Sequence, residues 1–159
     1  MSTYYCGVGS RKCPKDICDI MTEIASWHES KGFILRSGGA LGADTAFELG
    51  VKDSSKKQIF LASDPISKEA IDLAFKFHPM GNNLRYKGDY VVKLMARNGY
   101  QVLGPDLKTP SKYVVCWTPN ADSSGGTGQA IRIARAYNIP VYDLGDPDIL
   151  SRVLKQIQK

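Results

Sequence analysis

The sequence predicts an α/β protein with a Rossmann-like, three-layer α/β/α architecture and a mainly parallel sheet. Apolar, β-type runs alternate along the chain with segments whose apolar residues recur at helical spacing. Three Gly-rich segments each follow a β-type run: GVGSRK at residues 7–12, SGGALGAD at 37–44 and SSGGTGQ at 123–129. All strand-to-helix turns of a parallel sheet lie at one edge, so we expect these segments to meet in one pocket.

The first half of the chain predicts three strands and two helices. Residues 4–8 are aromatic and β-branched, which favours a buried strand. Pro14 suits the first turn of a helix, and apolar residues recur at helical spacing from Ile17 to Trp27 until Gly32 ends the pattern. Residues 33–35 form the second strand, a short helix then ends at Gly50, and residues 58–62 form the third strand.

The second half predicts four helices and two strands. Ser67 is a suitable N-cap for a helix that continues to Phe77, and the Pro- and Asn-rich residues 79–83 interrupt it. A helix over 90–96 is expected to end at Asn98 and Gly99. Strands at 113–117 and 141–144 and helices at 128–137 and 147–157 complete the pattern. No repeat or linker divides the chain, so residues 1–159 are predicted to form one domain.

Composition fits an ordinary globular protein with an anionic ligand. Of the 159 residues, 43% are hydrophobic and 23% charged, and no apolar run is long enough to span a bilayer. The N-terminal residues lack the order of a secretory signal, so a cytoplasmic protein without a membrane partner is expected. A net charge of +5 is spread along the chain, which suits an anion without by itself indicating DNA.

Metal and disulfide chemistry are not indicated. The four cysteines include no C-x-x-C pair, and buried, neutral thiols are expected. His28 and His78 are far apart in the sequence, and surface or capping roles are expected for both. We therefore predict neither a metal site nor a cofactor.

The ordered set GSR near residue 9, SGGAxGAD near 37 and GGTGQA near 125 resembles the SLOG superfamily of Rossmann-like proteins. This superfamily includes the DNA-processing protein DprA/Smf, the LOG phosphoribohydrolases and small stand-alone bacterial and phage proteins. The first two motifs are most similar to the DprA type, and the third is closer to the LOG type. The resemblance implies a nucleotide-type ligand in the crevice at the sheet edge, and a homo-oligomer, which the apolar and aromatic content of residues 75–90 also favours.

Two departures from the superfamily patterns are visible. LOG enzymes carry a Glu in the helix after the last Gly loop, and the matching position here is Arg132. DprA proteins have longer chains with further domains. LOG-like cleavage of a nucleoside monophosphate is therefore not implied by the motif as it stands.

The Gly loops supply the predicted phosphate-binding groups. Gly lets backbone N–H groups approach an anion closely, and a helix that begins there adds free N–H groups and the positive end of its dipole. Arg can bind phosphate oxygens with two parallel hydrogen bonds. The residues predicted to bind in these loops are Gly9, Ser10, Arg11, Ser37, Gly38, Gly39, Ala40, Gly125, Gly126, Thr127 and Gly128, with Arg132 one turn into the following helix.

Other candidates have structural alternatives. Asp44, the one candidate catalytic residue, lies in the first turn of a helix, where it can favour the dipole or accept hydrogen bonds from ribose hydroxyls. Arg97 and Asn98, with Gln101, form a polar cluster that either faces the ligand or ends a helix. Trp117 and Thr118 follow a strand, where the indole either stacks on a base or belongs to the core.

Three functions remain open from the sequence. The first is a small nucleotide-binding protein that senses or sequesters a phosphoribosyl ligand, because three anion loops occur without a recognisable catalytic set. The second is a nucleotide N-glycosidase in which Asp44 stabilises an oxocarbenium-like transition state or orients water. The third is DprA-like binding of single-stranded DNA, which requires a basic groove with stacking aromatic side chains.

Overall fold

A five-stranded parallel sheet forms the centre of the protein in the computed structural model, which describes residues 2–159. Its strands are β1 (Thr3–Gly7), β2 (Phe33–Ser37), β3 (Lys57–Ile59), β4 (Val114–Cys116) and β5 (Val141–Asp143). They lie in the order β3-β2-β1-β4-β5, and every neighbouring pair is parallel. This is the strand order of a Rossmann-like sheet, in which the direction of winding reverses between β1 and β4.

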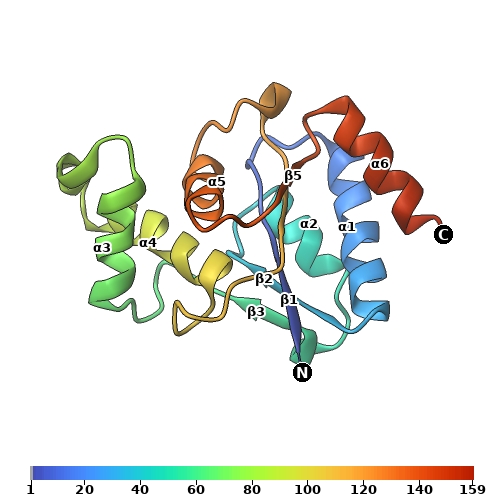
Figure 1. The fold of residues 1–159 in the computed structure, drawn as a ribbon, viewed down its shortest axis with the longest axis horizontal. Helices are drawn as coiled ribbons and strands as arrows, with labels where there is room; N and C mark the ends of the chain where they lie inside the picture. Colours follow the sequence, from blue (N-terminus) through green and yellow to red (C-terminus); the bar gives the residue numbers. More distant parts are fainter. Residues whose placement is uncertain (1) are drawn as a thin grey trace.

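Two layers of helices cover the sheet (Figure 1). The helices α1 (Lys15–Ser30), α2 (Ala43–Leu49) and α6 (Pro147–Ile157) pack on one face, around a core that includes Met21, Leu35 and Phe47. The helices α4 (Asp89–Leu103) and α5 (Thr127–Ala136) cover the other face, and α3 (Lys68–Phe77) packs outside them against α4. The 3₁₀ turns are η1 (Ser54–Lys56), η2 (Gly81–Lys87) and η3 (Pro119–Ala121). The predicted three-layer α/β/α architecture is confirmed.

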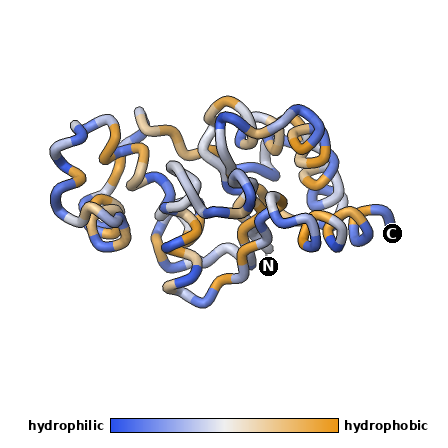
Figure 2. Tube along the Cα trace, turned by 90° about the horizontal axis from the view of Figure 1, so that it is seen from above, coloured by the Kyte–Doolittle hydropathy of each residue, from blue (hydrophilic) through white to orange (hydrophobic). Residues whose placement is uncertain are grey.

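The helices are amphipathic, as their position between core and solvent requires. Figure 2 shows hydrophobic and hydrophilic residues alternating along the helices, including α6 beside the C-terminus. Ser67 caps α3 as expected, because its Oγ accepts a hydrogen bond from the backbone N–H of Ala70 at 3.2 Å. The amphipathic pattern thus places one face of each helix toward the sheet or toward a neighbouring helix.

The largest error in the predicted elements concerns α4. The helix was expected to end at Asn98 and Gly99, but it continues to Leu103. Gly99 and the residues after it are buried, and Val102 and Leu103 belong to the core under α5. Burial of this last turn outweighs the modest cost of a Gly inside the helix. The prediction failed because it used a local breaker signal where tertiary packing decides.

The expectation for His28 was also wrong, because the imidazole is buried rather than at the surface. Its ring stacks on Tyr5 with 3.9 Å between centroids. Its Nδ1–H donates to the carbonyl of Ile24 at 2.7 Å, and its Nε2 accepts from the hydroxyl of Tyr113 at 2.6 Å. Both ring nitrogens are therefore satisfied inside the protein. His78, in contrast, has the expected capping role, since its Nδ1 accepts from the backbone N–H of Met80.

Candidate functional site

A cavity of about 390 Å³ lies at the carboxyl edge of the sheet, where the winding reverses between β1 and β4. Its walls come from the loop after β1, the loop and first turn of α2, the inner face of α4 and the beginning of α5. The lining residues are Val8, Gly9, Ser10, Arg11, Ala40, Asp44, Tyr90, Val91, Leu94, Met95, Arg97, Asn98, Gln101, Gly126 and Thr127. Open α/β sheets bind ligands in this type of crevice.

The first two Gly loops are packed directly against each other. Gly42 has φ +83°, and a Cβ there would lie 2.8 Å from the carbonyl oxygens of both Ser10 and Arg11. A residue with a side chain would be strained and would push the loops apart. The Ala43 N–H also donates to the carbonyl of Ser10 at 3.4 Å. Close approach of the two loops is therefore the reason that this position requires glycine.

Anion-binding groups surround the mouth of the cavity. Arg11 is exposed, so its guanidinium is free to meet a ligand from solvent. Gly126 and Thr127 lie at the N-terminus of α5, where the first N–H groups of a helix have no intrahelical partner and the helix dipole is positive. These groups favour a phosphate at this end of the cavity.

Asp44 lies at the floor of the cavity and is only 4% exposed. Burial raises the pKa of its carboxyl group to about 6, against the smaller opposing effects of the Arg97 charge and of backbone N–H groups. One of these groups is the N–H of Ala40, which donates to Asp44 Oδ2 at 3.2 Å. The carboxyl group is therefore able to change its protonation state near neutral pH.

Arg97 connects α4 to the second Gly loop. Its Nη1 donates to the carbonyl oxygen of Gly38 at 2.5 Å, and burial is the main reason that its pKa is lowered. A Cβ on Gly38 would lie 2.6 Å from Gln101 Nε2, 2.9 Å from Asp44 Oδ2 and 3.0 Å from Arg97 Cζ. The three polar side chains therefore converge on the space beside Gly38, which glycine leaves open.

Buried polar atoms without a hydrogen-bond partner concentrate at this floor. Within residues 2–159 they are Asp44 Oδ1, Arg97 Nε, both amide atoms of Gln101, the Ser37 hydroxyl and, elsewhere, the Tyr5 hydroxyl. Buried polar groups are almost always paired in folded proteins, and each unpaired one costs free energy. Their concentration around one cavity is therefore the expected signature of a place where a ligand supplies the missing partners.

The structure brings together about half of the predicted binding residues. Those that line the cavity are Gly9, Ser10, Arg11, Ala40, Asp44, Arg97, Asn98, Gly126 and Thr127, so all three Gly loops do reach one cavity. Ser37 and Gly38 lie next to it, as the contacts around Gly38 show. The position of Gly39 differs, because its Cβ direction faces Leu61 and Ile59 instead.

Five further predicted residues lie outside the cavity lining, and three of these five have clear structural roles. Trp117 packs against the core on the α1 face of the sheet. Thr118 is fully buried, and its Oγ1 donates to Asp143 Oδ2 at 2.5 Å. Arg132 donates from Nε to the carbonyl of Phe77 at 2.9 Å and from Nη2 to Gln129 Oε1 at 2.6 Å. These contacts hold each side chain away from the cavity.

The remaining two are the outer glycines of the third loop. Gly125 has φ +68°, and a Cβ added there would meet no atom within 4 Å, so glycine is needed at this position for the backbone conformation of the turn. A Cβ on Gly128 would lie 2.1 Å from the carbonyl oxygen of Ser123, so it serves the packing of the loop on α5. Only the middle of this Gly-rich segment therefore faces the cavity.

Sequence reasoning predicted that Arg97 and Asn98, with Gln101, could face a ligand, but it missed the apolar and aromatic side chains that α4 adds to the cavity wall. Tyr90, Leu94 and Met95 line the cavity from this helix, together with Val91 and the amide of Gln101. Their helical spacing was visible, but nothing in the sequence distinguished a wall facing a ligand from one facing the core. A polar Gln101 inside an apolar stretch was the one available signal.

Within residues 2–159, no group of three or more His, Cys, Asp or Glu side chains is arranged to hold a metal ion. None of the helices in this part of the chain is long and apolar enough to cross a membrane. The four cysteines are free, and Cys6 and Cys116 are buried, with thiol pKa values that burial raises above the usual range.

Together, the sheet order and the edge cavity define a Rossmann-like α/β protein with a crevice whose mouth carries a basic side chain and a helix N-terminus. No protein-family model matches the sequence, and no curated protein matches it. Among solved structures, the fold is similar to that of DNA processing protein A from Helicobacter pylori, which binds single-stranded DNA. The TM-score is 0.58 at 19% identity, over 97% of this chain and 72% of that one. The resemblance to DprA proteins is thus confirmed for the fold.

Proposed function

We propose that this protein binds single-stranded DNA, with one nucleotide held in the cavity at the carboxyl edge of the sheet. The observation that carries the proposal is the cavity itself, which joins cationic and helix N-terminal groups at its mouth to unpaired polar atoms at its floor. The fold likeness to a protein that binds single-stranded DNA supports the choice of ligand. This was the third expectation from the sequence, and the comparison favours it over the first.

The phosphate fits the mouth of the cavity and not its floor. Arg11 and the N-terminus of α5 supply positive charge at the mouth, whereas Asp44 at the floor repels an anion whenever it is ionised. The floor offers donors and acceptors together, from Gln101, Asp44 and Arg97. Such a mixed set suits the neutral, hydrogen-bonding edge of a base or the hydroxyls of a sugar.

Aromatic and basic side chains continue from the cavity along the surface of η2 and the start of α4. Tyr90 lines the cavity and is 64% exposed, and Tyr86 is 74% exposed. Between them, Lys87 is exposed, and the Arg85 guanidinium lies 5.2 Å from the centroid of the Tyr86 ring. Bases stack on exposed rings while cations follow the phosphates, which is the usual way to bind a strand without reading its sequence. A mononucleotide in the cavity would not reach Tyr86 and Lys87 as well, whereas a strand of several nucleotides would.

The test is fluorescence anisotropy with a labelled oligothymidylate of about 20 nucleotides at several salt concentrations. We expect saturable binding that weakens as salt rises, because displaced counterions contribute to affinity. Tyr90→Ala is expected to weaken binding about tenfold, since one stacked base contributes on the order of 1–3 kcal/mol. Tyr137→Ala is the matched control, because Tyr137 is exposed but lies outside the cavity. Absence of binding, or equal loss in both variants, contradicts the proposal.

A free nucleotide is the second candidate ligand, and the size of the cavity favours it. A volume of about 390 Å³ accommodates a small ligand of nucleotide size. Calorimetry with mononucleotides, and native mass spectrometry of gently purified protein, test this candidate. If the native protein released free base from a mononucleotide and Asp44→Asn did not, the protein would also have N-glycosidase activity. Tight mononucleotide binding without oligonucleotide binding would replace the first proposal. The native mass spectra also test the expected homo-oligomer.

A further inference from the structure

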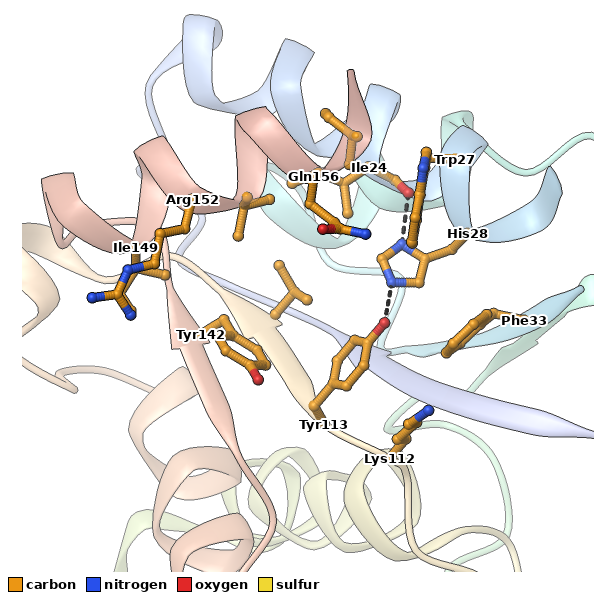
Figure 3. A pocket seen from close by; sticks show the side chains of 13 residues that line it. Ile24, Trp27, His28, Phe33, Lys112, Tyr113, Tyr142, Ile149, Arg152 and Gln156 are labelled. Atoms are coloured by element: carbon orange, nitrogen blue, oxygen red, sulfur yellow. Dashed lines mark hydrogen bonds between the residues drawn. The ribbon is translucent and has the colours of Figure 1, made fainter. Parts of the chain in front are cut away.

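A second cavity, of about 440 Å³, lies at the opposite edge of the sheet from the proposed DNA site (Figure 3). It is partly open to solvent and is bounded by α1, by α6 and by strand residues that include Phe33 at the start of β2 and Tyr113 just before β4. None of its lining residues is shared with the first cavity. Its chemistry can therefore be considered independently of the proposed DNA binding.

The walls of this second cavity are apolar and aromatic. Ile24 and Trp27 line it from α1, and Val153 and Ile157 line it from α6. Every residue of α6 keeps some exposure to solvent, so this helix covers the sheet without filling the space beneath it. The apolar walls therefore face a space that is partly open to solvent, and exposed apolar surface of this kind often marks a binding groove.

The buried imidazole of His28 in the wall has hydrogen-bond partners on both of its ring nitrogens. Figure 3 shows His28 between the carbonyl of Ile24 and the hydroxyl of Tyr113, with hydrogen bonds of 2.7 and 2.6 Å. Burial lowers the pKa of His28 to about 4, so the imidazole is uncharged at neutral pH. Stacking on Tyr5 fixes the ring in place. His28 thus contributes a neutral aromatic ring to the wall of the cavity.

Charge at the cavity has a single sign. Lys112 and Arg152 line it and are exposed, whereas no Asp or Glu occurs among its lining residues in the described part of the chain. Lys112 extends over the Phe33 ring, with 5.8 Å between Nζ and the ring centroid. Figure 3 shows Lys112 and Arg152 on opposite sides of the cavity, so a ligand with its apolar body between the aromatic walls can place an anionic end beside either one of these cations.

We propose that this cavity binds a small amphipathic carboxylate, with an aliphatic or aromatic body of about ten carbon atoms. The volume lies within the usual range for small-molecule sites, which are largely apolar and carry a few polar groups that fix orientation. The positive rim selects a carboxylate over a neutral molecule of the same shape. The apolar interior selects a hydrophobic body over a nucleotide.

The test uses decanoate as the ligand, measured by its displacement of the fluorescent probe 8-anilinonaphthalene-1-sulfonate. We expect saturable displacement by decanoate, and displacement at least tenfold weaker in Val153→Phe, which fills the cavity. The double variant Lys112→Ala/Arg152→Ala is expected to weaken the binding of decanoate about three- to tenfold. Its affinity for the neutral decanamide should be unchanged. Lys155→Ala is the matched control, because Lys155 is exposed on α6 and lies outside the cavity lining.

Circular dichroism and thermal melting verify that Val153→Phe folds, and Ile149→Phe is a second variant that fills the same space. Absence of displacement, or displacement that neither filling variant reduces, overturns the proposal. Sedimentation at several protein concentrations tests the other possible occupant of the cavity, a second copy of this chain. Self-association that Val153→Phe abolishes and decanoate leaves unchanged would show that a second copy of this chain covers the cavity, and would also overturn the proposal. Oligonucleotide binding is expected to stay unchanged throughout.

Discussion

The guanidinium of Arg97 in α4 holds the backbone carbonyl of Gly38 in the loop after β2, with 2.5 Å between Nη1 and the oxygen. The same charge lowers the pKa of Asp44, although burial has the larger, opposite effect. Arg97 therefore contacts a Gly loop and also moderates the rise that burial causes in the pKa of the carboxyl group at the cavity floor. Arg97 belongs to α4, the helix that the sequence predicted to end at Asn98, directly after it.

Replacing Arg97 by Met is expected to raise the pKa of Asp44 above about 6 and to weaken oligonucleotide binding. The pKa should rise because the buried carboxylate loses the favourable charge of Arg97. Binding should weaken because the Gly38 carbonyl loses its hydrogen bond to Arg97. Titration of the Asp44 side-chain carbon by NMR measures the first effect, and anisotropy measures the second. Lys93→Met is the control on the same helix, since Lys93 is exposed and lies outside the cavity lining. An unchanged titration would show that Arg97 does not act on Asp44.

Arg11 is expected to contribute directly to phosphate binding. Arg11→Ala should weaken binding about ten- to a hundredfold, because a charge-assisted hydrogen bond to a phosphate contributes on the order of 1.5–3 kcal/mol. The side chain is exposed, so the melting temperature should not change. Lys12→Ala removes the neighbouring exposed charge, which lies outside the cavity lining, and serves as the control. Equal affinity in Arg11→Ala and in the native protein would place the phosphate elsewhere.

Hydrophobic periodicity was sufficient to predict most elements of the fold. The helix expected over residues 147–157 is observed as Pro147–Ile157, because Asp146 caps it and Pro147 begins it. The position of the Gly loops at one edge also followed, since parallel strands place all such turns together. What local sequence could not reveal was the direction of each side chain at that edge.

Thr118 and Arg132 illustrate that limit. Both lie at the predicted edge, yet each is turned toward a protein partner: Thr118 toward Asp143, and Arg132 toward the carbonyl of Phe77. These partners belong to distant segments of the chain, so their contacts depend on tertiary packing. Gln101, conversely, reaches the cavity because α4 continues past Gly99, which only the packing of its last turn explains.

Arg132→Ala is therefore expected to affect stability and not binding. Its hydrogen bonds to Phe77 and Gln129 connect α5 to the end of α3, and their loss should lower the free energy of unfolding by about 1 kcal/mol. Urea denaturation measures this change. Arg135→Ala, at an exposed position of the same helix, should lower it less. A tenfold loss of oligonucleotide affinity in Arg132→Ala would contradict this expectation and show that Arg132 contributes to binding.

Asp44 should make stability depend on pH. Its pKa is about 6 in the folded protein against a reference value of 3.8, so the folded state binds the proton more tightly. The contribution of Asp44 to the unfolding free energy should then be most favourable below about pH 4 and should fall by up to about 3 kcal/mol as pH rises through 6. Asp44→Asn lacks this contribution. Its stability relative to the native protein should therefore be greater at pH 7.5 than at pH 4, as urea denaturation at both values can measure; an equal difference would contradict the raised pKa.

Gly38 provides a test of the cavity floor that leaves every polar group in place. A Cβ at this position would lie 2.6 Å from Gln101 Nε2 and 2.9 Å from Asp44 Oδ2, closer than real contacts allow. Both atoms belong to side-chain ends, so Gly38→Ala should displace them without unfolding the protein. Oligonucleotide affinity is expected to fall at least tenfold, because unpaired donors and acceptors must be well placed to meet a ligand.

The control for this variant is Gly99→Ala, within α4. The nearest atom to a Cβ there is Leu107 Cδ2 at 3.4 Å, an ordinary contact, and alanine favours a helix more than glycine does. Gly99→Ala should therefore keep full affinity and melt at the same or a higher temperature than the native protein. If Gly38→Ala also keeps full affinity while it is folded, then Gln101 and Asp44 do not contact the ligand. The unpaired polar atoms at the floor would then be a cost of the fold rather than part of a binding site.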